Sequence, residues 1–338
     1  MAEVTIIVPI YNVEKYLPKC LDSLINQTFK DIEIWAISDG SPDNSIDIIH
    51  RYEKKDNRIK CIEKENGGYG SVLEYAINNI SSPFFLICDP DDWLNQEAIE
   101  KLYKAAIGNN LDFVRAGYYT TFSDGSKDEY NDGIIMPEIF NPEFDKVYDE
   151  EINRFLFLTE SPHSKLFKTN IAKGIYFPHK VSFTDGLLYK LYIPKIKNAM
   201  ILKDALSYYL IDREGNTATD FKPKIADQHK IVFDSTMEQY AKYENKDDMF
   251  YYRMLLQCEF VNFQVGNIRD RKAFLEKREL VFDMYKSCMK YKKEIKKCFK
   301  YESFRRKLVF SLILNPLTSK TILKYISNRV WKRNAGKI

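Results

Sequence analysis

The chain has 338 residues, of which 45% are hydrophobic and 14% aromatic. This composition is typical of a globular protein, excludes a disordered chain, and leaves room for about one to three domains. The first residues lack a basic leader and no apolar run is long enough to cross a bilayer, so we expect neither a signal peptide nor a membrane span. Six scattered cysteines without a CxxC spacing indicate reduced thiols in a cytoplasmic protein, not a zinc site or a disulfide framework.

The net charge is only +3, but it is distributed unevenly. From Lys286 to the end, sixteen lysines and arginines stand against two glutamates, so this stretch carries +14 and the rest of the chain −11. Such a split predicts an anionic partner surface for the carboxyl-terminal part. Nucleic acid fits poorly as that partner, because no zinc-finger spacing, RNP-type strand or other recognised binding module occurs.

The amino-terminal third alternates short apolar runs with stretches whose apolar residues recur at helical spacing. The predicted strands are 4–9, 32–37, 59–62 and 84–88, and the predicted helices begin near 13, 41, 72 and 96. Strict alternation of strands and helices predicts a parallel, doubly wound α/β sheet with right-handed crossovers.

The fourth of these strands ends abruptly at three carboxylates, Asp89, Asp91 and Asp92, with Pro90 in the turn between the first two. Clustered carboxylates raise each other's pKa unless a cation neutralises them. A divalent ion such as Mg²⁺ or Mn²⁺ does this and is commonly shared with substrate phosphates. The alternative is a polar loop in which Asp91 or Asp92 caps the following helix.

Polar residues follow the carboxyl ends of the first four predicted strands. They are Tyr11 and Asn12, then Asp39, then 66–69, then the aspartate cluster. In open α/β sheets ligands bind in the crevice outside these ends, so we expect one binding site there. Neither GxGxxG nor GxxxxGK[ST] occurs, which argues against a dinucleotide dehydrogenase and a P-loop NTPase.

Two stretches carry a family resemblance, VTIIVPIYNVEKYLPKCLDSLINQTFKDIEIWAISDGSPDNS and FFLICDPDDWL. Together they resemble the family-2 glycosyltransferases, enzymes of the GT-A fold whose bacterial members build capsules, exopolysaccharides and wall glycans. The resemblance is close over the first third of the chain and continues weakly to about Thr219. It implies an α/β fold with a GT-A-type doubly wound, mostly parallel sheet, helices on both faces, and a helical C-terminal region.

The resemblance also implies roles for residues in the crevice. Pro9 and Tyr11 are expected to line a uracil pocket, and Asp39 to hydrogen-bond the base. Asp89 is expected to reach the ribose, and Asp91 to bind Mn²⁺ or Mg²⁺ on the diphosphate of a UDP-sugar donor.

Other interpretations of these positions stay open. The family usually has two acids before the Gly-Ser after the second strand, whereas this chain has Ser38 in the first place and Asp39 in the second. Tyr11 can instead pack on the first helix, and Asp39 can form an Asx turn. Family members use the region of Asn66 to contact the base or diphosphate, but Asn66-Gly67-Gly68 can also be only a tight loop.

The middle of the chain resembles the acceptor side of the family. A strand is predicted at 113–122, and the polar, aromatic stretch 121–148 is expected to form a loop over the site. Thr184-Asp185 stands where the family usually has Glu-Asp, so Asp185 is the candidate general base. The alternative for Asp185 is a helix cap or turn residue before Gly186.

Two further residues have paired interpretations. His163-Ser164 stands where the family usually has Trp-Asn, so His163 is either an acceptor or diphosphate contact or a buried, hydrogen-bonded histidine. Arg213 stands where relatives carry a short basic-polar motif near the donor, and its alternative is a solvated loop arginine.

The carboxyl-terminal third has little glycine or proline, and its apolar residues recur at helical spacing from about residue 223. Within it, 304–317 combines large apolar residues with Arg305, Arg306 and Lys307. Such a basic amphipathic segment can lie in the headgroup plane of an anionic bilayer. A packed helix with a solvated cationic face has the same pattern.

We therefore expect a nucleotide-sugar-binding half at 1–115, an acceptor-side half at 116–220 and a basic helical region at 221–338. The preferred function is an inverting, metal-dependent transfer of a sugar from a UDP-sugar to a lipid-linked or growing cell-surface glycan, by a cytoplasmic protein peripheral to the inner face of the cell membrane. One alternative is nucleotidyl transfer, which the absence of a Gly-rich basic motif at 9–12 disfavours. Another is a non-catalytic, membrane-associated scaffold whose nucleotide site has decayed, for which Ser38 and Thr184 are the hints.

Overall fold

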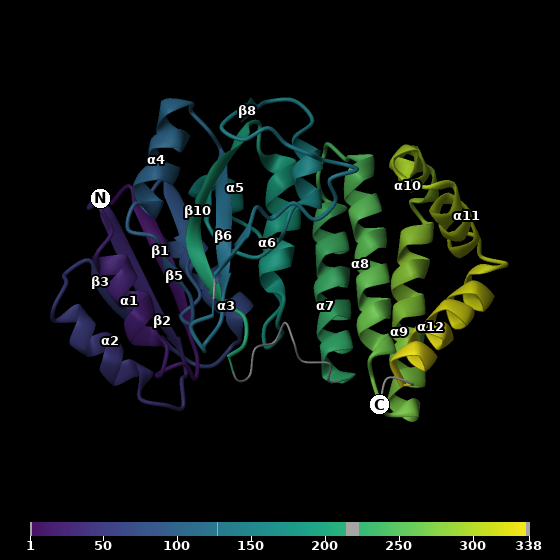
Figure 1. Cartoon of the computed structure of the whole chain (residues 1–338), viewed down its shortest axis with the longest axis horizontal. Coiled ribbons are helices and arrows are strands. Elements are labelled where there is room, and N and C mark those ends of the chain that lie inside the picture. Colours follow the sequence, from purple (N-terminus) through teal and green to yellow (C-terminus); the bar gives the residue numbers. More distant parts are fainter. Residues whose placement is uncertain (1, 127, 214–222, 336–338) are drawn as a thin grey trace. The chain divides into compact units, whose positions relative to one another are not determined.

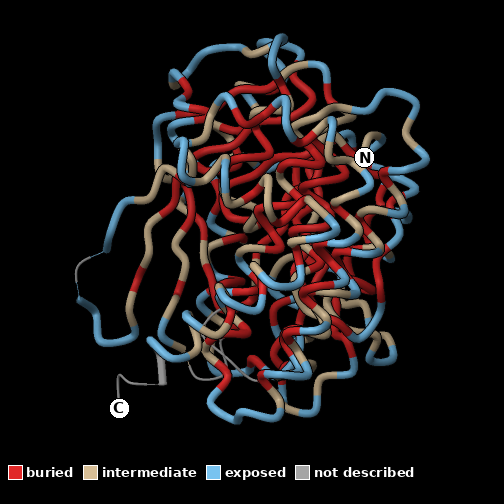
Figure 2. Tube along the Cα trace, turned by 90° about the vertical axis from the view of Figure 1, so that its right-hand side faces the viewer, coloured by how far each residue is buried: buried red, intermediate tan, exposed pale blue. Residues whose placement is uncertain are grey.

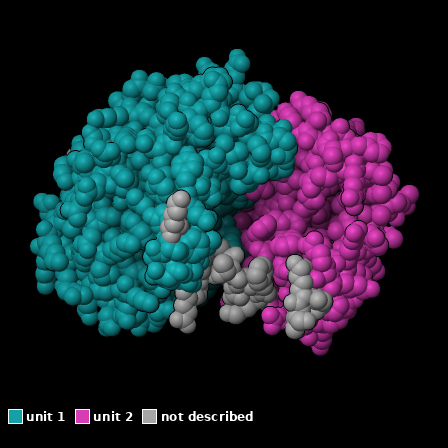
Figure 3. All heavy atoms as spheres, viewed as in Figure 1, with its two compact units in different colours: residues 1–216 teal, residues 217–338 magenta. Residues whose placement is uncertain are grey.

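The computed structural model describes residues 2–126, 128–213 and 223–335. The chain divides into two compact units, 1–216 and 217–338, which are described separately (Figure 3). The expected domain boundary at 220 lies outside the described residues, and the expected boundary at 115 falls within a strand of the first unit. The division of the first unit into donor and acceptor halves therefore stays a prediction.

The first unit is built on one sheet, in which the described residues form ten strands. They are β1 (Val4–Ile10), β2 (Ile32–Asp39), β3 (Ile59–Lys64), β4 (Phe84–Ile87), β5 (Trp93–Leu94), β6 (Phe113–Thr121), β7 (Glu129–Asn131), β8 (Val147–Tyr148), β9 (Lys165–Lys168) and β10 (Ala199–Leu210). The strand order is β3-β2-β1-β4-β9-β6-β10-β5, with β7 beside β6 and β8 beside β10. Figure 1 labels most of these strands, from β3 at the left of the view to β8 at the top.

The direction of the strands confirms the expected GT-A-type α/β fold. β1 to β4 are parallel neighbours, and β6 and β10 form a second parallel pair. β9 lies between β4 and β6 and is antiparallel to both, so β4 and β6 still point the same way. The carboxyl ends of β1, β2, β3, β4 and β6 therefore lie along one edge of the sheet.

β1 is buried along its whole length, as its continuous β-branched run predicts. Pro9 lies inside β1, opposite Ile37 of β2. On its other side β1 pairs with β4 only from Val4 to Ile7, so the ladder between these two strands ends before Pro9. A residue without an N–H is tolerated where a strand has lost one neighbour.

Helices connect the strands of this unit as the alternating pattern predicts. They are α1 (Leu17–Ile25), α2 (Ser45–Glu53), α3 (Tyr69–Asn79), α4 (Ala98–Gly108), α5 (Thr169–Ala172) and α6 (Thr184–Tyr192), with 3-10 turns η1 (Ile152–Phe157) and η2 (Ile193–Lys195). Apolar residues of α1 and α4 join those of the strands in one buried core. Figure 2 shows this pattern along the trace, with buried residues in red and exposed turns in blue.

α1 and α2 each begin four residues later than predicted, α1 at Leu17 instead of near residue 13. The sequence predicts a start at Ser41, whereas α2 begins at Ser45. The Asp43 carboxylate accepts hydrogen bonds from the backbone N–H of Glu14 at 2.8 Å and of Ser45 at 3.2 Å. The Ser41 hydroxyl accepts from the N–H of Asn12 at 2.8 Å. These bonds tie the turn to the segment after β1, so α2 starts only beyond it.

In the second unit, the secondary structure of the described residues is entirely helical. This confirms the predicted helical C-terminal region. The helices are α7 (Pro223–Tyr240), α8 (Asp248–Gly266), α9 (Arg271–Met289), α10 (Lys292–Lys297), the 3-10 turn η3 (Cys298–Tyr301), α11 (Phe304–Ile313) and α12 (Ser319–Ala335). Side-chain caps start α8 and α9: the Asp247 carboxylate accepts from the Met249 N–H at 2.7 Å, and that of Asp270 from the Ala273 N–H at 2.6 Å. Within the described ranges, no helix has both the length and the apolar content needed to cross a bilayer.

α11, α12 and the turn between them leave large apolar side chains in contact with solvent. Phe304 is 83% exposed, Leu308 54%, Leu317 91% and Tyr325 64%. The exposed basic residues of the same two helices are Arg305, Lys320, Lys324, Arg329, Lys332 and Arg333. We call these ten residues the basic apolar patch.

Candidate functional site

The predicted site residues of the first four strands gather at one edge of the sheet. Asp39 is the last residue of β2, Tyr11 follows β1, and Asp89 and Asp91 come shortly after β4. Because β1, β2 and β4 are parallel neighbours, the chain segments carrying these side chains lie next to one another. This is the edge at which open α/β sheets bind their ligands.

Asp39 holds the loop that leads into α3. Its Oδ1 accepts from the Gly67 N–H at 2.9 Å and its Oδ2 from the Gly68 N–H at 2.7 Å. The Lys64 ammonium pairs with Oδ1 at 2.5 Å. Gly68 has a φ of +83°, and a Cβ there would lie 2.9 Å from the backbone of Lys180, so only glycine fits. The carboxylate is therefore structural as well as a candidate for contact with the base.

Pro9, Tyr11 and Asn66 lie at the rim of the site. Pro9 is buried inside β1, whereas Tyr11 is 51% exposed. The side chain of Asn66 is exposed, and its backbone lies 3.1 Å from where a Cβ would sit on Gly40. Gly40 has a φ of +63°, so the turn after β2 brings Asp39 and Asn66 together.

Tyr69, the first residue of α3, reaches across to the carboxylate cluster. Its hydroxyl donates to Asp89 Oδ1 at 2.8 Å. Burial, together with the charges of Asp92 and Asp91, raises the pKa of Asp89 to about 8. The site thus concentrates negative charge in a poorly solvated place, which favours a cation as ligand.

Asp91 contacts a positively charged residue from a distant part of the sequence. Its carboxylate pairs with the Nε of Arg213, which follows β10. The side chain of Asp91 is 9% exposed and that of Arg213 is 21% exposed, so the pair is largely shielded from water. The interpretation of Arg213 as a solvated loop residue is therefore wrong in this structure.

Asp92 is buried, is hydrogen-bonded to two other segments of the chain, and does not cap a helix. It accepts from the Leu210 N–H at 2.9 Å, and its Oδ2 lies 2.7 Å from His163 Nε2. The helix α4 instead begins after Glu97, which makes no side-chain cap bond. Burial lowers the pKa of His163 to about 4, so the ring is neutral. His163 is thus a buried, hydrogen-bonded histidine, the second of its two interpretations.

Asp185 is the second residue of α6, so it is not the N-cap. Phe183 holds that place with a φ of +68°, a strained conformation for a bulky residue. Burial raises the pKa of the Asp185 carboxyl, and the nearby charge of Glu160 raises it further. Glu160 lies beside Gly186, where a Cβ would come within 2.6 Å of its Oε2, and it pairs with Lys190 at 2.5 Å.

The start of α6 packs against the start of α3, which brings Asp185 to the same site. A Cβ on Gly70 would lie 3.0 Å from the methyl group of Thr184. The pKa of Tyr69 is raised well above its ordinary value by burial and by the charges of Asp89, Asp185 and Asp91. Asp89 accepts the hydrogen bond of this phenol, and the charges of Asp91 and Asp185 act on the same group.

The donor atoms at this site fit a hard divalent cation. Carboxylate oxygens are the ligands that Mg²⁺ and Mn²⁺ prefer. Asp91 already binds a cationic group, and Asp89 carries a pKa raised by its neighbours. One ligand atom each from Asp89, Asp92 and His163 lie within 4.8 Å of one another.

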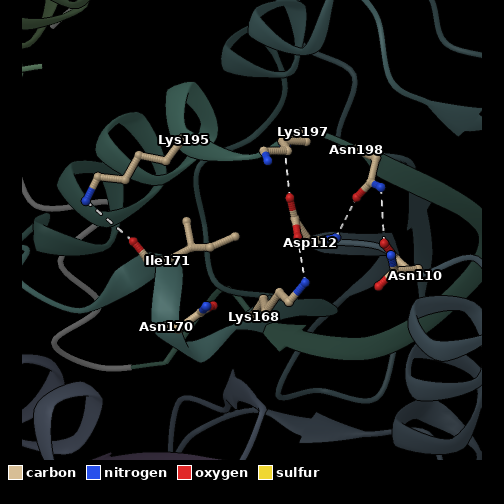
Figure 4. A pocket seen from close by; sticks show the side chains of 8 residues that line it. All are labelled: Asn110, Asp112, Lys168, Asn170, Ile171, Lys195, Lys197 and Asn198. Atoms are coloured by element: carbon tan, nitrogen blue, oxygen red, sulfur yellow. Dashed lines mark hydrogen bonds and ion pairs between the residues drawn. The ribbon is translucent and has the colours of Figure 1, made fainter. Parts of the chain in front are cut away.

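A pocket of about 350 Å³ lies elsewhere in the first unit (Figure 4). Its lining includes Asp112, just before β6, and Asn198, just before β10. The ion pair of Lys168 with Asp112 at 2.9 Å closes part of it. Because it opens at the amino ends of these strands, it lies at the opposite edge of the sheet from the carboxylates and is not the donor site.

Sequence reasoning missed several contributions to this site. Asp92 was considered only as a metal-cluster member or cap, although it connects three chain segments. Glu160 and Lys190 were not singled out, and no local motif marks them because the two members of this ion pair are 30 positions apart in the sequence. Lys64 is one of two lysines on β3, and nothing in the sequence distinguishes it from Lys60.

Comparisons with known proteins give the family. Residues 5–174 match the family described as glycosyl transferase family 2. Glycosyltransferase GlyA of Streptococcus pneumoniae is 30% identical over 81% of this chain and 40% of its own length. The poly(ribitol-phosphate) beta-glucosyltransferase of Bacillus spizizenii is 31% identical over 63% of this chain and 33% of its own length. The chain thus spans two fifths or less of these relatives.

Solved structures agree in fold. S. aureus TarS 1–349 in complex with UDP-GlcNAc superposes with a TM-score of 0.69 at 18% identity, covering 99% of this chain and 91% of that one. The mannosyltransferase PcManGT from Pyrobaculum calidifontis, in complex with GDP-Man and Mn²⁺, gives a TM-score of 0.52 at 13% identity, covering 98% and 86%. Since the family match extends over half of the chain, this chain belongs to glycosyl transferase family 2.

Proposed function

We propose that this chain is an inverting, metal-dependent glycosyltransferase, moving a sugar from a UDP-sugar to a hydroxyl of a lipid-linked or growing cell-surface glycan. The observations that carry the proposal are the hydrogen bond of Tyr69 to Asp89 and the ion pair of Arg213 with Asp91 at the ligand-binding edge of the sheet. The shared fold of a TarS complex with UDP-GlcNAc supports a UDP-sugar as donor.

The donor would lie across the carboxyl ends of β1, β2 and β4. Tyr11, half exposed beyond β1, offers an aromatic face to the uracil ring beside Pro9. Each carboxylate oxygen of Asp39 accepts one hydrogen bond from the Gly67–Gly68 backbone and can accept another from the base. Asn66 lies next to Asp39. The carboxylate of Asp89 reaches the ribose.

Asp91 is the proposed ligand for Mn²⁺ or Mg²⁺. When bound, this ion neutralises the charge that develops on the leaving diphosphate. Arg213 pairs with Asp91 and carries a charge-assisted donor suited to phosphate oxygens. Its role is to orient the diphosphate from the side of β10.

Asp185 is the proposed general base. An acceptor hydroxyl attacks the anomeric carbon from the face opposite the diphosphate, Asp185 takes the hydroxyl proton, and UDP leaves with inversion at that carbon. Partial burial raises the pKa of Asp185, which makes its carboxylate a stronger base than an exposed aspartate. Glu160, paired with the buried Lys190, holds the start of α6 in place.

The basic apolar patch of α11 and α12 is the proposed contact with the inner face of an anionic membrane. Aromatic and aliphatic side chains enter the headgroup boundary, while the surrounding lysines and arginines attract anionic lipids. Contact at the membrane would bring the site to lipid-linked acceptors. This proposal is independent of the assignment of the donor site.

A panel of UDP-sugars tests the proposed reaction. Each sugar is incubated with the protein and Mn²⁺, and slow hydrolysis is followed by proton NMR. We expect one donor to be hydrolysed in preference to the others, with the newly formed sugar released first as the anomer opposite to that of the donor. Release with retained configuration would contradict the inverting mechanism, and no hydrolysis of any donor would contradict the choice of UDP-sugars.

A further inference from the structure

Four potential metal ligands meet at the edge of the sheet, on α2 and on the strand that follows it. β3 is the first strand in the order and pairs with β2. Cys61 and Glu63 are two residues apart on β3, so their side chains share one face of the strand. His50 and Glu53 are three residues apart on α2, so they share one face of the helix.

The imidazole of His50 contacts the carboxylates of both Glu53 and Glu63. His50 Nδ1 lies 3.4 Å from Glu53 Oε2, and His50 Nε2 lies 3.8 Å from Glu63 Oε1. The other oxygen of Glu53 accepts a hydrogen bond from the Cys61 N–H at 3.0 Å, which directs this carboxylate to the cysteine. One ligand atom each of His50, Cys61 and Glu63 all lie within 4.8 Å of one another.

We propose that His50, Cys61 and Glu63 bind a zinc ion with water in the fourth position, while Glu53 holds the His50 ring through its other nitrogen. Zinc prefers four-coordinate sites built from thiolate, imidazole and carboxylate groups, and this set supplies all three. A hard ion such as Mg²⁺ is a poor fit, because it does not favour sulfur. Nothing in the proposed sugar transfer uses these residues, so the site is additional to that function.

The geometry needs only a small adjustment to hold the ion. Bonds of about 2.0–2.3 Å to a tetrahedral zinc place the ligand atoms roughly 3.3–3.8 Å apart. The side chains of His50 and Glu63 are 44% and 57% exposed, so they can move closer without repacking the core. Cys61 and the backbone of β3 stay where they are.

The charges around the thiol also favour a cation. A carboxylate oxygen of Glu53 accepts from the backbone N–H of Cys61, and a carboxylate oxygen of Glu63 lies within 4.8 Å of the Cys61 sulfur. The thiol proton is released to solvent as the Zn–S bond forms. The bound ion would fasten α2 to an edge strand that has only one neighbour in the described sheet.

The sequence alone argued against zinc because no CxxC spacing occurs. The ligands proposed here come from two elements, separated by the turn between α2 and β3, and only one is a cysteine. The folded chain, not a local motif, brings them together.

Cobalt provides the test, because its thiolate complexes absorb strongly in the near ultraviolet. The reduced, metal-free full chain carrying Asp91→Asn, which disables the proposed donor cation site, is titrated with Co²⁺ and then with Zn²⁺. We expect a charge-transfer band at one equivalent of Co²⁺ that Zn²⁺ abolishes. Cys61→Ser should lose the band, and His50→Gln should weaken Co²⁺ binding at least about 10-fold.

His179→Gln is the matched control, because His179 pairs with Glu74 at 2.8 Å and is 52% exposed. It should leave the titration unchanged. A second readout is the melting temperature, which one equivalent of Zn²⁺ should raise in the parent and not in His50→Gln. Absence of the band in the parent, or a band that survives Cys61→Ser, would overturn the proposal whatever the outcome of UDP binding.

Discussion

Arg213 forms an ion pair with Asp91 across 122 positions of sequence. The pair joins the turn after β4 to the segment after β10, so it closes one side of the carboxylate cluster. A guanidinium is the natural partner of a carboxylate and of a phosphate alike. The same arginine thus neutralises Asp91 in the free protein and is placed to meet the diphosphate of a donor.

Replacing the proposed base should separate chemistry from binding. Asp185→Asn removes the group that accepts the proton, so turnover should fall by about 10²–10⁴-fold. Binding of UDP, measured by calorimetry, should stay within about twofold, because the variant keeps the shape of the side chain. Asp204→Asn, at an exposed aspartate paired with Lys101, is the control and should turn over normally. Full turnover by Asp185→Asn would show that another group is the base.

The pH dependence of turnover should report the same residue. Burial raises the pKa of Asp185, and only its ionised form can accept a proton. Activity should therefore be full above this raised pKa and should be lost as the pH falls through it, at a pH higher than an exposed aspartate would give. The acidic limb of kcat/KM against pH measures this. A profile that stays flat down to the range of ordinary aspartates would contradict the assignment.

Asp92 should contribute more to the stability of the fold than an exposed aspartate such as Asp204. Asp92→Ala leaves the buried N–H of Leu210 and the ring of His163 without their hydrogen-bond partner. Unpaired buried groups of this kind cost about 1–3 kcal/mol each, so the free energy of unfolding in urea should fall by roughly 2–6 kcal/mol. Asp204→Ala should change it by less than about 0.5 kcal/mol. Equal stability of the two variants would mean that the hydrogen bonds of Asp92 do not stabilise the fold.

The basic apolar patch should bind vesicles containing anionic lipid in flotation assays. The double variant Phe304→Ser, Leu308→Ser removes two exposed apolar side chains, and Lys320→Glu, Lys324→Glu reverses two charges. Both should reduce the bound fraction, the second more strongly at low salt because surface attraction is screened by ions. Phe260→Ser, at a residue of α8 that is 50% exposed, is the matched control. Equal binding by all variants would show that the patch does not contact lipid.

Much of the sheet could be predicted because its strands are short, continuous and apolar. The runs at 4–9, 32–37, 59–62 and 84–88 appear as β1 to β4 with ends shifted by three residues or fewer. The helix at 41 was predicted too early, since the bonds of Asp43 to Glu14 depend on the fold and leave no mark in the local sequence. The position of β9 between β4 and β6 was also beyond prediction, because strand pairing across long separations has no local signal.

The part of the candidate site that lies at the ends of strands could be predicted from the sequence. Asp39, Asp89 and Asp91 follow apolar runs, and their meeting follows from parallel strands alone. The contacts of Asp185 with its surroundings required the packing of α6 on α3, which depends on Gly70 having no side chain. The sequence contains these residues, but the distances between them follow only from the folded structure.

The most direct test of the central claim is a calorimetric titration of the protein with UDP, with and without Mn²⁺. Our account predicts that Mn²⁺ strengthens UDP binding to the parent chain and that Asp91→Asn removes this effect while binding of UDP alone persists. UDP binding that is indifferent to Mn²⁺ in the parent, or an Mn²⁺ effect that remains in Asp91→Asn, would contradict it.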